Sequence, residues 1–261
     1  MSTAAPLSPP IALCLGGLDP SGGAGLVRDV LALGGLGLNP MAIPTAETVQ
    51  NGVACTRIEA PTLDPVDRLE ALGVHLTAPW GLKLGLCAVE DATLRRLAAA
   101  LRSLAPHVRI WDPILAPSAG VGLHDGGDLR RMADLLLPMG QWVVSPNRGE
   151  AAAAAGLPPE QIRTAAPEAL AAPWLERGAR AVWLKGGHAV GEAVQDYWIS
   201  AEGTTALPPS PRLAGQRRGT GCTLAALWLG LRLLGRTDLE AAVEAAERLR
   251  DSWDRAFVPG L

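Results

Sequence analysis

An apolar run that passes through a glycine-rich loop into a helix constrains the fold of this chain most. Residues 10–17 predict a buried strand, residues 16–25 contain five glycines, and residues 26–33 have a helical pattern. This order is typical of the βα unit of a parallel sheet. Similar strands are predicted to end near Ala46, Cys87, Asp112, Asn147 and Leu184. The sequence therefore predicts an α/β fold, with one domain over residues 10–261 built on a doubly wound, mostly parallel sheet flanked by helices.

Other segments complete this prediction. Residues 91–104 and 238–257 predict amphipathic helices, because their apolar side chains recur at helical spacing. Residues 193–199 and 204–213 predict an antiparallel pair around a Glu-Gly turn. The strand at residues 41–46 is followed by six residues, 47–52, for which a polar turn is one interpretation.

Composition narrows the class of partner. The chain has 261 residues, of which 48% are hydrophobic and 19% charged, and its net charge is −3. This charge argues against nucleic acid or an anionic membrane as the main partner. The sequence shows no apolar run of about 18 residues, the length that spans a membrane. No basic residue precedes Arg28, so we expect residues 1–9 to be a disordered leader and the protein to be cytoplasmic.

The four cysteines are dispersed and form no Cys-x-x-Cys pair. Their spacing supports neither a zinc site nor a disulfide framework.

The sequence Gly219-Thr220-Gly221-Cys222 stands before an apolar, helix-favouring run. Glycines allow several backbone N–H groups to converge, and a helix N-terminus carries a partial positive charge. Together these features favour an anion site, most plausibly for phosphate. Plain helix capping is the alternative interpretation of the same residues.

Polar residues also follow the predicted strands. Gln50 can donate and accept hydrogen bonds at once, as recognition of a heterocycle edge requires. Asn147 and Glu150 are three apart at an expected helix start, where they can cap the helix or hold Mg²⁺ through water. Lys185, at a strand end, is either solvated or a phosphate ligand. Since the carboxyl ends of parallel strands share one edge, we expect these residues and Asp112 to converge.

In order along the chain, seven motifs resemble those of the hydroxymethylpyrimidine/phosphomethylpyrimidine kinases of thiamin biosynthesis, within the ribokinase-like small-molecule kinases. They cover residues 10 to about 235. The motifs are Gly17-Leu18-Asp19-Pro20-Ser21-Gly22-Gly23-Ala24-Gly25 with Asp29, Thr45-Ala46-Glu47-Thr48-Val49-Gln50-Asn51, Lys83-Leu84-Gly85, Asp112-Pro113-Ile114-Leu115, Ser145-Pro146-Asn147-Arg148-Gly149-Glu150-Ala151, Leu184-Lys185-Gly186-Gly187-His188 and Gly219-Thr220-Gly221-Cys222-Thr223-Leu224.

The resemblance implies phosphorylation, dependent on ATP and Mg²⁺, of the hydroxymethyl group of 4-amino-5-hydroxymethyl-2-methylpyrimidine. A second phosphorylation, of the monophosphate to the diphosphate, is common in the family. A homodimer is also implied.

By position, the resemblance assigns roles to particular residues. Those that would hold the pyrimidine are Gly17, Asp29 and Gln50, with Leu86 and Ile114 as apolar walls. Those that would handle Mg²⁺ and phosphate are Asn147, Glu150, Asp112 and Lys185. Those that would form the anion hole are Gly219, Thr220, Gly221 and Cys222, with Cys222 at the catalytic position.

The chain departs from the family pattern at several positions. Many ribokinase-like kinases have an aspartate where Cys222 stands. A thiol at a helix N-terminus can have a depressed pKa and act as a weak base, although Cys222 could also only fill space. Residues 117–120 lack the usual lysine, Glu47 replaces an apolar residue, and Arg218 replaces a common histidine.

Two rival functions stay open at this point. One is a pyridoxal kinase of the same fold. Gln50 favours the pyrimidine over pyridoxal, because an amide can pair with a ring nitrogen and an exocyclic amine. The other is a non-catalytic sensor that binds the pyrimidine. Lys185, Asn147 and Glu150 argue against a sensor, since pure binding needs no phosphate-handling groups.

Overall fold

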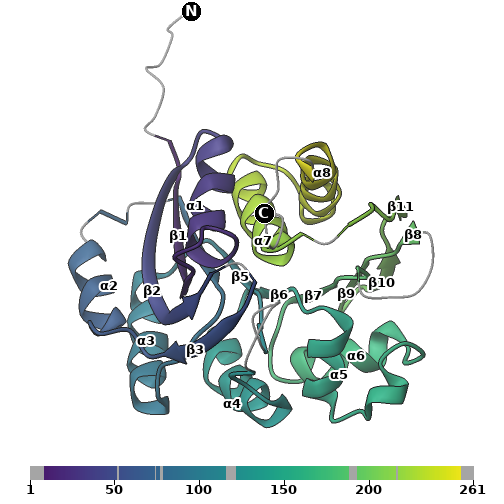
Figure 1. The fold of residues 1–261 in the computed structure, drawn as a ribbon, viewed down its shortest axis with the longest axis horizontal. Helices are drawn as coiled ribbons and strands as arrows, with labels where there is room; N and C mark the ends of the chain where they lie inside the picture. The colour runs from purple at the N-terminus through teal and green to yellow at the C-terminus, as the bar shows by residue number, and fades with distance from the viewer. Residues whose placement is uncertain are drawn as a thin grey trace, which may run out of the picture.

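A computed structural model describes residues 9–51, 53–73, 75–76, 79–115, 122–187, 193–215 and 217–253. The expected leader and residues 117–120 fall almost wholly outside these ranges. Figure 1 shows a layered α/β arrangement in which a central sheet lies between two groups of helices. The α/β prediction is therefore confirmed.

Nine strands form the main sheet in the order β10-β9-β7-β6-β5-β4-β1-β2-β3. The strands from β2 to β7 in this order run parallel, and β3, β9 and β10 pair antiparallel. Their bounds are β1 Ile11–Leu18, β2 Asn39–Gln50, β3 Cys55–Glu59, β4 Trp80–Leu84, β5 Val108–Trp111, β6 Trp142–Val144, β7 Ala181–Leu184, β9 Tyr197–Ser200 and β10 Gly203–Ala206. The short strands β8 (Ala193–Val194) and β11 (Ser210–Pro211) pair separately.

Helices cover both faces of the sheet. Their bounds are α1 Gly25–Gly35, α2 Pro65–Gly73, α3 Asp91–Leu104, α4 Gly126–Leu136, α5 Arg148–Ala155, α6 Pro167–Leu175, α7 Thr220–Leu233 and α8 Asp238–Asp251, with 3₁₀ turns η1 Leu137–Met139 and η2 Pro159–Gln161. Two hydrophobic clusters fill the layers: α1, α7 and α8 supply one, and α2 to α6 supply the other. Figure 1 shows these groups on opposite sides of the sheet. The strand β1 contributes side chains to both clusters: Leu13 and Leu15 face one, and Ala12 and Cys14 face the other.

The order of the parallel strands places a topological switch point between β1 and β4. From β1 the chain moves to β2 on one side, whereas β4, β5, β6 and β7 follow on the other. In open α/β sheets, ligands bind outside the carboxyl ends of the strands at such a point. The loop 16–25 and the residues that follow Leu84 meet at this edge.

Two predicted strand ends were wrong. The strand β2 does not end near Ala46 but continues to Gln50, because Thr48 to Gln50 pair with β3 beyond the end of β1. The strand β4 ends at Leu84, not near Cys87. After Gly85 the chain turns toward β2, where the Thr45 hydroxyl donates to the Leu86 carbonyl and Ala88 N–H donates to the Thr45 carbonyl. The antiparallel pair is confirmed as β9 and β10 with β8 and β11.

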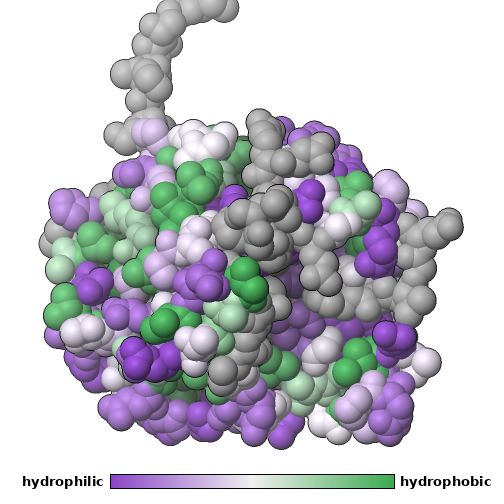
Figure 2. All heavy atoms as spheres, in the orientation of Figure 1, coloured by the Kyte–Doolittle hydropathy of each residue, from purple (hydrophilic) through white to green (hydrophobic). Residues whose placement is uncertain are grey.

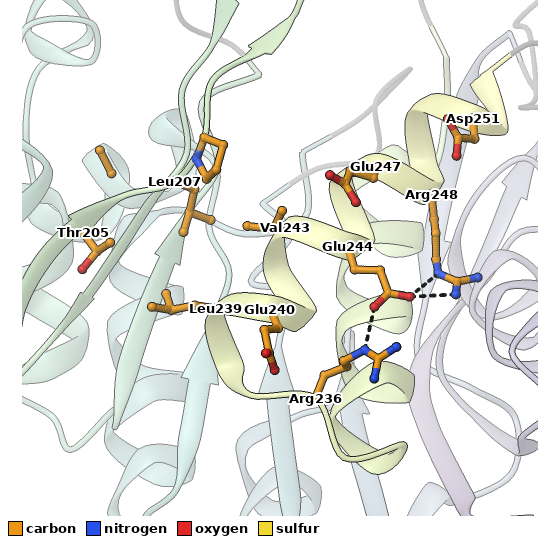
Figure 3. A pocket seen from close by; sticks show the side chains of 12 residues that line it. Thr205, Leu207, Arg236, Leu239, Glu240, Val243, Glu244, Glu247, Arg248 and Asp251 are labelled. Carbon is orange, nitrogen blue, oxygen red and sulfur yellow. Dashed lines mark hydrogen bonds and ion pairs between the residues drawn. The ribbon is translucent and has the colours of Figure 1, made fainter.

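On the face drawn in Figure 2, hydrophilic and hydrophobic residues are interspersed. None of the described helices is long and apolar enough to cross a membrane. A surface groove runs between α8 and the end of β10, where Leu239 and Val243 alternate with charged residues (Figure 3). Glu244 in this groove pairs with Arg236 and Arg248. No residue predicted for the functional site lines it.

Candidate functional site

At the switch point, the glycine-rich loop packs so tightly on the end of β1 that only glycine fits. A Cβ on Gly25, which has φ +58°, would lie 2.1 Å from the Gly17 carbonyl oxygen. A Cβ on Gly17 would lie 3.0 Å from the side chain of Leu86, and Thr45 Oγ1 donates to the Leu86 carbonyl at 2.7 Å. The glycine-rich loop therefore folds back over the end of β1, with Leu86 as an apolar wall against Gly17.

A buried ion pair lies beneath this loop. Lys83 Nζ donates to Asp29 Oδ2 at 2.8 Å, and the two side chains are 1% and 0% exposed. Lys83 comes from β4 and Asp29 from α1, so the pair crosses from the sheet to the helix layer. Asp29 Oδ1 is buried and has no hydrogen-bond partner among the described residues. A buried acceptor without a donor is costly, so this oxygen is suited to a ligand's N–H or O–H.

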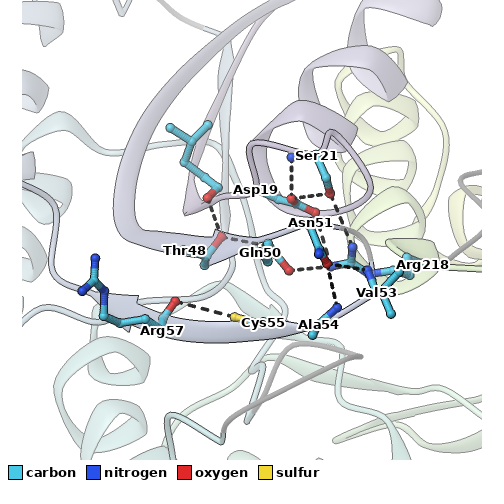
Figure 4. A network of polar contacts seen from close by, with 11 residues as sticks. Asp19, Ser21, Thr48, Gln50, Asn51, Val53, Ala54, Cys55, Arg57 and Arg218 are labelled. Carbon is cyan, nitrogen blue, oxygen red and sulfur yellow. Dashed lines mark hydrogen bonds and ion pairs between the residues drawn. The ribbon is translucent and has the colours of Figure 1, made fainter. Parts of the chain in front are cut away.

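Gln50 belongs to a polar network at the end of β2 (Figure 4). Its Oε1 accepts from Arg218 at 2.5 Å, and its Nε2 donates to Thr48 Oγ1 at 2.8 Å. Arg218 is 3% exposed and also contacts Asp19, at 3.4 Å. Because a guanidinium only donates, the carbonyl side of the Gln50 amide must face Arg218. Gln50 can thus offer a ligand a donor, but in this arrangement it cannot pair with a ring nitrogen and an amine together.

A second buried ion pair lies after β7 and β5. Lys185 Nζ donates to Asp112 Oδ1 at 2.6 Å, with side chains 10% and 3% exposed. The start of α7 lies against this pair, since a Cβ on Gly221 would be 3.3 Å from Lys185 Nζ and 3.7 Å from Asp112 Oδ2. Residues that directly follow β7 and β5 therefore meet the start of α7 here, as the sequence predicts.

Asn147 and Glu150 form a capping box at the start of α5. Glu150 N–H donates to Asn147 Oδ1 at 3.0 Å, and Asn147 N–H donates to Glu150 Oε2 at 2.7 Å. Burial raises the pKa of Glu150 to about 7, partly offset by Lys185, and Asp112 raises it further. The capping interpretation is confirmed, and Glu150 lies close enough to feel both members of the Lys185–Asp112 pair.

These acids fit a Mg²⁺ ion that reaches the protein with a nucleotide. Among the described residues, no group of three or more His, Cys, Asp or Glu side chains could hold a metal ion by itself. Mg²⁺ usually takes one or two carboxylates and completes its shell with water and substrate phosphates. Asp112 and Glu150 would supply those carboxylates.

The N-terminus of α7 has the features that an anion site needs. Gly219 is the N-cap with φ +71°, and no side chain caps the helix. A Cβ at Gly219 would lie 2.4 Å from the Gly23 carbonyl, so α7 is packed directly on the glycine-rich loop. The first N–H groups of a helix have no intrahelical acceptor. Those of Thr220, Gly221 and Cys222 would face an anion bound beside Lys185, and Gly219 is the N-cap of α7 in either interpretation of the motif.

Cys222 does not have the depressed pKa that a base would need. Its side chain is buried, and burial raises the pKa of the thiol to about 12 despite the nearby charge of Lys83. Desolvation of the thiolate thus outweighs the helix N-terminus, which is the physical reason why the expected direction is wrong. The thiol is neutral near pH 7.

The structure brings most of the predicted residues into two groups. Gly17, Asp29 and Leu86 lie at the switch point. Asp112 and Lys185 lie against Gly221, and Asn147 and Glu150, at the start of α5, lie next to the Lys185–Asp112 pair. Ile114 lies two residues beyond Asp112, and its N–H donates to the Asp112 carbonyl. Sequence reasoning gave no role to Lys83. A lysine inside the otherwise apolar segment Trp80–Leu84 was the available signal.

Known proteins are similar to this chain over most of its length. Residues 19–256 match the family described as Phosphomethylpyrimidine kinase. The chain is similar to the hydroxymethylpyrimidine/phosphomethylpyrimidine kinase of Rhizobium meliloti, with 31% identity over 92% of each chain. It is also similar to that of Synechococcus elongatus, with 32% identity over 91% of this chain and 89% of the relative.

Solved structures share the fold. A pyridoxal kinase from Staphylococcus aureus superposes with a TM-score of 0.76 at 22% identity, covering 92% of this chain and 86% of that one. A phosphomethylpyrimidine kinase from Clostridium difficile gives 0.74 at 21% identity, covering 94% and 99%. The match to the family model and the sequence relatives show that the chain belongs to the phosphomethylpyrimidine kinase family.

Proposed function

We propose that this protein transfers the γ-phosphoryl group of ATP to the hydroxymethyl group of 4-amino-5-hydroxymethyl-2-methylpyrimidine, and then phosphorylates the monophosphate to the diphosphate. The observation that carries the proposal is the arrangement of α7. Its uncapped N-terminus lies between the buried Lys185–Asp112 pair and the switch point where Asp29 offers an acceptor without a donor.

The switch-point end suits a neutral ring with an exocyclic amine. Asp29 Oδ1 would accept a hydrogen bond from the amine, and Leu86 beside Gly17 would form an apolar wall. Gln50, oriented by Arg218, would donate to a ring nitrogen. Ile114, after β5, would be a second wall, as the family resemblance implies.

The other end suits phosphoryl transfer. Lys185 and the N–H groups of residues 220–222 would stabilise charge on the moving phosphoryl group, for which positioning and electrostatics dominate. Asp112 and Glu150 would hold Mg²⁺, which when bound neutralises phosphate charge. Asn147 would orient Glu150 through the capping box.

The adenosine of ATP would extend away from Lys185 along the next residues. Gly186 N–H donates to Asp196 Oδ1 at 2.7 Å. Asp196 lines a small groove with apolar residues such as Val194 and Ala246. Structures of the S. aureus pyridoxal kinase with an ATP analogue and with ADP have the same fold, which supports use of ATP.

The deciding experiment incubates the protein with ATP, Mg²⁺ and one heterocycle at a time, and measures ADP and the phosphorylated product. We expect turnover of the aminopyrimidine and of its monophosphate. Preferential turnover of pyridoxal would instead make the protein a B6-vitamer kinase. Binding of the pyrimidine with no ADP from either heterocycle would make it a sensor.

Two further parts of the proposal concern assembly and location. A homodimer is implied by the family resemblance, and light scattering coupled to gel filtration would measure its mass. A cytoplasmic location is also proposed, and cell fractionation would test it.

A further inference from the structure

Lys83 and Asp29 form the most deeply buried ion pair among the described residues, yet nothing in phosphoryl transfer requires it. The two side chains are 1% and 0% exposed. Lys83 lies in β4, where its neighbours Leu82 and Leu84 face the opposite cluster. Period-2 alternation therefore turns Lys83 toward α1 and α7. A charged side chain at this position has a desolvation cost that apolar packing would avoid.

The surroundings of Lys83 fix its ammonium group in one place. A Cβ on Gly85 would lie 3.3 Å from Lys83 Nζ, so the backbone after β4 approaches it closely. The Asp29 oxygen that it binds, Oδ2, lies beside Gly16, whose Cβ would be 4.0 Å away. The ammonium thus occupies one carboxylate oxygen and leaves Oδ1 for another donor.

The positive charge of Lys83 determines whether Asp29 Oδ1 belongs to an ionised carboxylate. Burial raises the pKa of Asp29 to about 6, although Lys83 acts in the lowering direction. Without the lysine, the same burial would protonate the carboxyl near neutral pH. A protonated carboxyl would be a weaker acceptor for an amine N–H than a carboxylate.

We propose that Lys83 is a positioning residue, which keeps Asp29 a carboxylate and reserves its Oδ1 for the exocyclic amine of the pyrimidine. This inference rests on the proposed function and deepens it, because it makes the Lys83–Asp29 pair the group that selects a ring with an exocyclic amine. Because the pair is neutral as a whole, it favours an uncharged ring that carries an N–H donor. Lys83 itself need not touch the substrate.

Other ionisable side chains lie near the Lys83–Asp29 pair. Cys14 from β1, Cys222 from α7 and Asp112 after β5 all influence the Lys83–Asp29 pair. Burial raises the pKa values of both thiols, so they stay neutral between pH 6 and 9. Asp112 is paired with Lys185. None of these groups changes in the variants below.

The test compares wild type, Lys83→Met and the double variant Asp29→Asn/Lys83→Met in steady-state kinetics from pH 5.5 to 9. At pH 7 we expect Lys83→Met to raise KM for the aminopyrimidine about 10- to 100-fold, the range for a lost hydrogen bond to a charged group, with a smaller change in kcat. In wild type, KM should rise only below about pH 6. In Lys83→Met this rise should begin at higher pH, because the carboxyl loses its cation.

The double variant is the matched control, since it removes both charges and keeps the shapes. It should lose the Asp29-dependent change of KM with pH, so any change that remains belongs to the substrate or other groups. If the melting curve shows that Lys83→Met does not fold, the pH dependence of KM in the double variant alone tests the proposal. Persistence there of the wild-type rise below pH 6 would overturn the proposal.

A second probe, 5-hydroxymethyl-2-methylpyrimidine, lacks the amine. We expect Lys83→Met to weaken turnover of the amine-bearing ring and to leave KM for this analogue within about threefold, since no ion-assisted bond is lost. An equal loss on both rings would indicate a merely structural pair and overturn the inference. Wild type that fails to phosphorylate either ring would overturn the proposed function, and this inference with it.

Discussion

Two buried lysine–aspartate pairs lie at the two ends of the proposed site, and their surroundings differ in net charge. Lys83–Asp29 stands without a further acid in hydrogen-bond contact, whereas Lys185–Asp112 has Glu150 close by. The first pair is neutral, which suits an uncharged ring. The second group carries an excess of acid when Glu150 is ionised, which suits a cation accompanying phosphates. Under the proposed function, one additional carboxylate would adapt similar buried pairs to different ligands.

The pairs also differ in their relation to backbone donors. The N–H groups at the start of α7 lie next to Lys185, as the position of Gly221 shows. Lys83 instead lies beside Gly85, inside the sheet edge. Removing each lysine should therefore affect a different kinetic constant.

The largest effect is expected from Lys185→Met. Lys185 would supply positive charge to the transferring phosphoryl group, and loss of one such preorganised group typically lowers kcat by about 10²- to 10³-fold. KM for the pyrimidine should stay within about threefold, since the other pair is intact. Initial rates of ADP release at saturating ATP would measure both constants. A rise in KM with kcat unchanged would break the division of roles between the two lysines.

Gly221→Ala should act on the phosphate end alone. The new Cβ would lie 3.3 Å from Lys185 Nζ, so it would occupy space beside the anion site and lower kcat about 100-fold. Folding should not suffer, because alanine favours a helix over glycine by about 1 kcal/mol. Rates and melting temperatures would be compared with Gly34→Ala, another helical substitution, whose Cβ meets no atom within 4 Å. A variant with low activity and low stability would contradict this explanation.

The two ends of the site differ in how far the sequence could predict them. The bounds of α3, β5 and β7 are confirmed because apolar periodicity is a local signal. The Lys83–Asp29 contact joins residues 54 apart, and no local pattern indicates which acid a buried lysine meets. The extension of β2 to Gln50 also depends on pairing with another strand. The pKa of Cys222 depends on burial by several elements, which a motif at a helix start does not reveal.

Arg218→Met tests a third buried cation, which belongs to neither pair. Its loss would free the Gln50 amide to rotate, so we expect KM for the pyrimidine to rise about tenfold, the cost of one hydrogen bond of about 1.5 kcal/mol. The change in kcat should be small because Lys185–Asp112 is untouched. The neighbouring Arg217→Met is the control, since Arg217 donates to the Trp253 carbonyl instead. Equal kinetic losses in both variants would show that positive charge at this end of the site matters, and that the orientation of Gln50 does not.

The smallest effect is expected from Cys222→Ser, which changes the residue between the two pairs. The pKa of the thiol is about 12, so it is protonated near pH 7 and cannot accept the proton of the hydroxymethyl group. A loose, largely dissociative transition state needs little base assistance, because the attacking oxygen bonds late. The serine keeps the backbone N–H that would face the phosphate in the proposed site. We therefore expect kcat to stay within about threefold on both the alcohol and the monophosphate, measured at pH 7 to 9. A large loss confined to the alcohol would restore the base role, since only that substrate has a proton to remove.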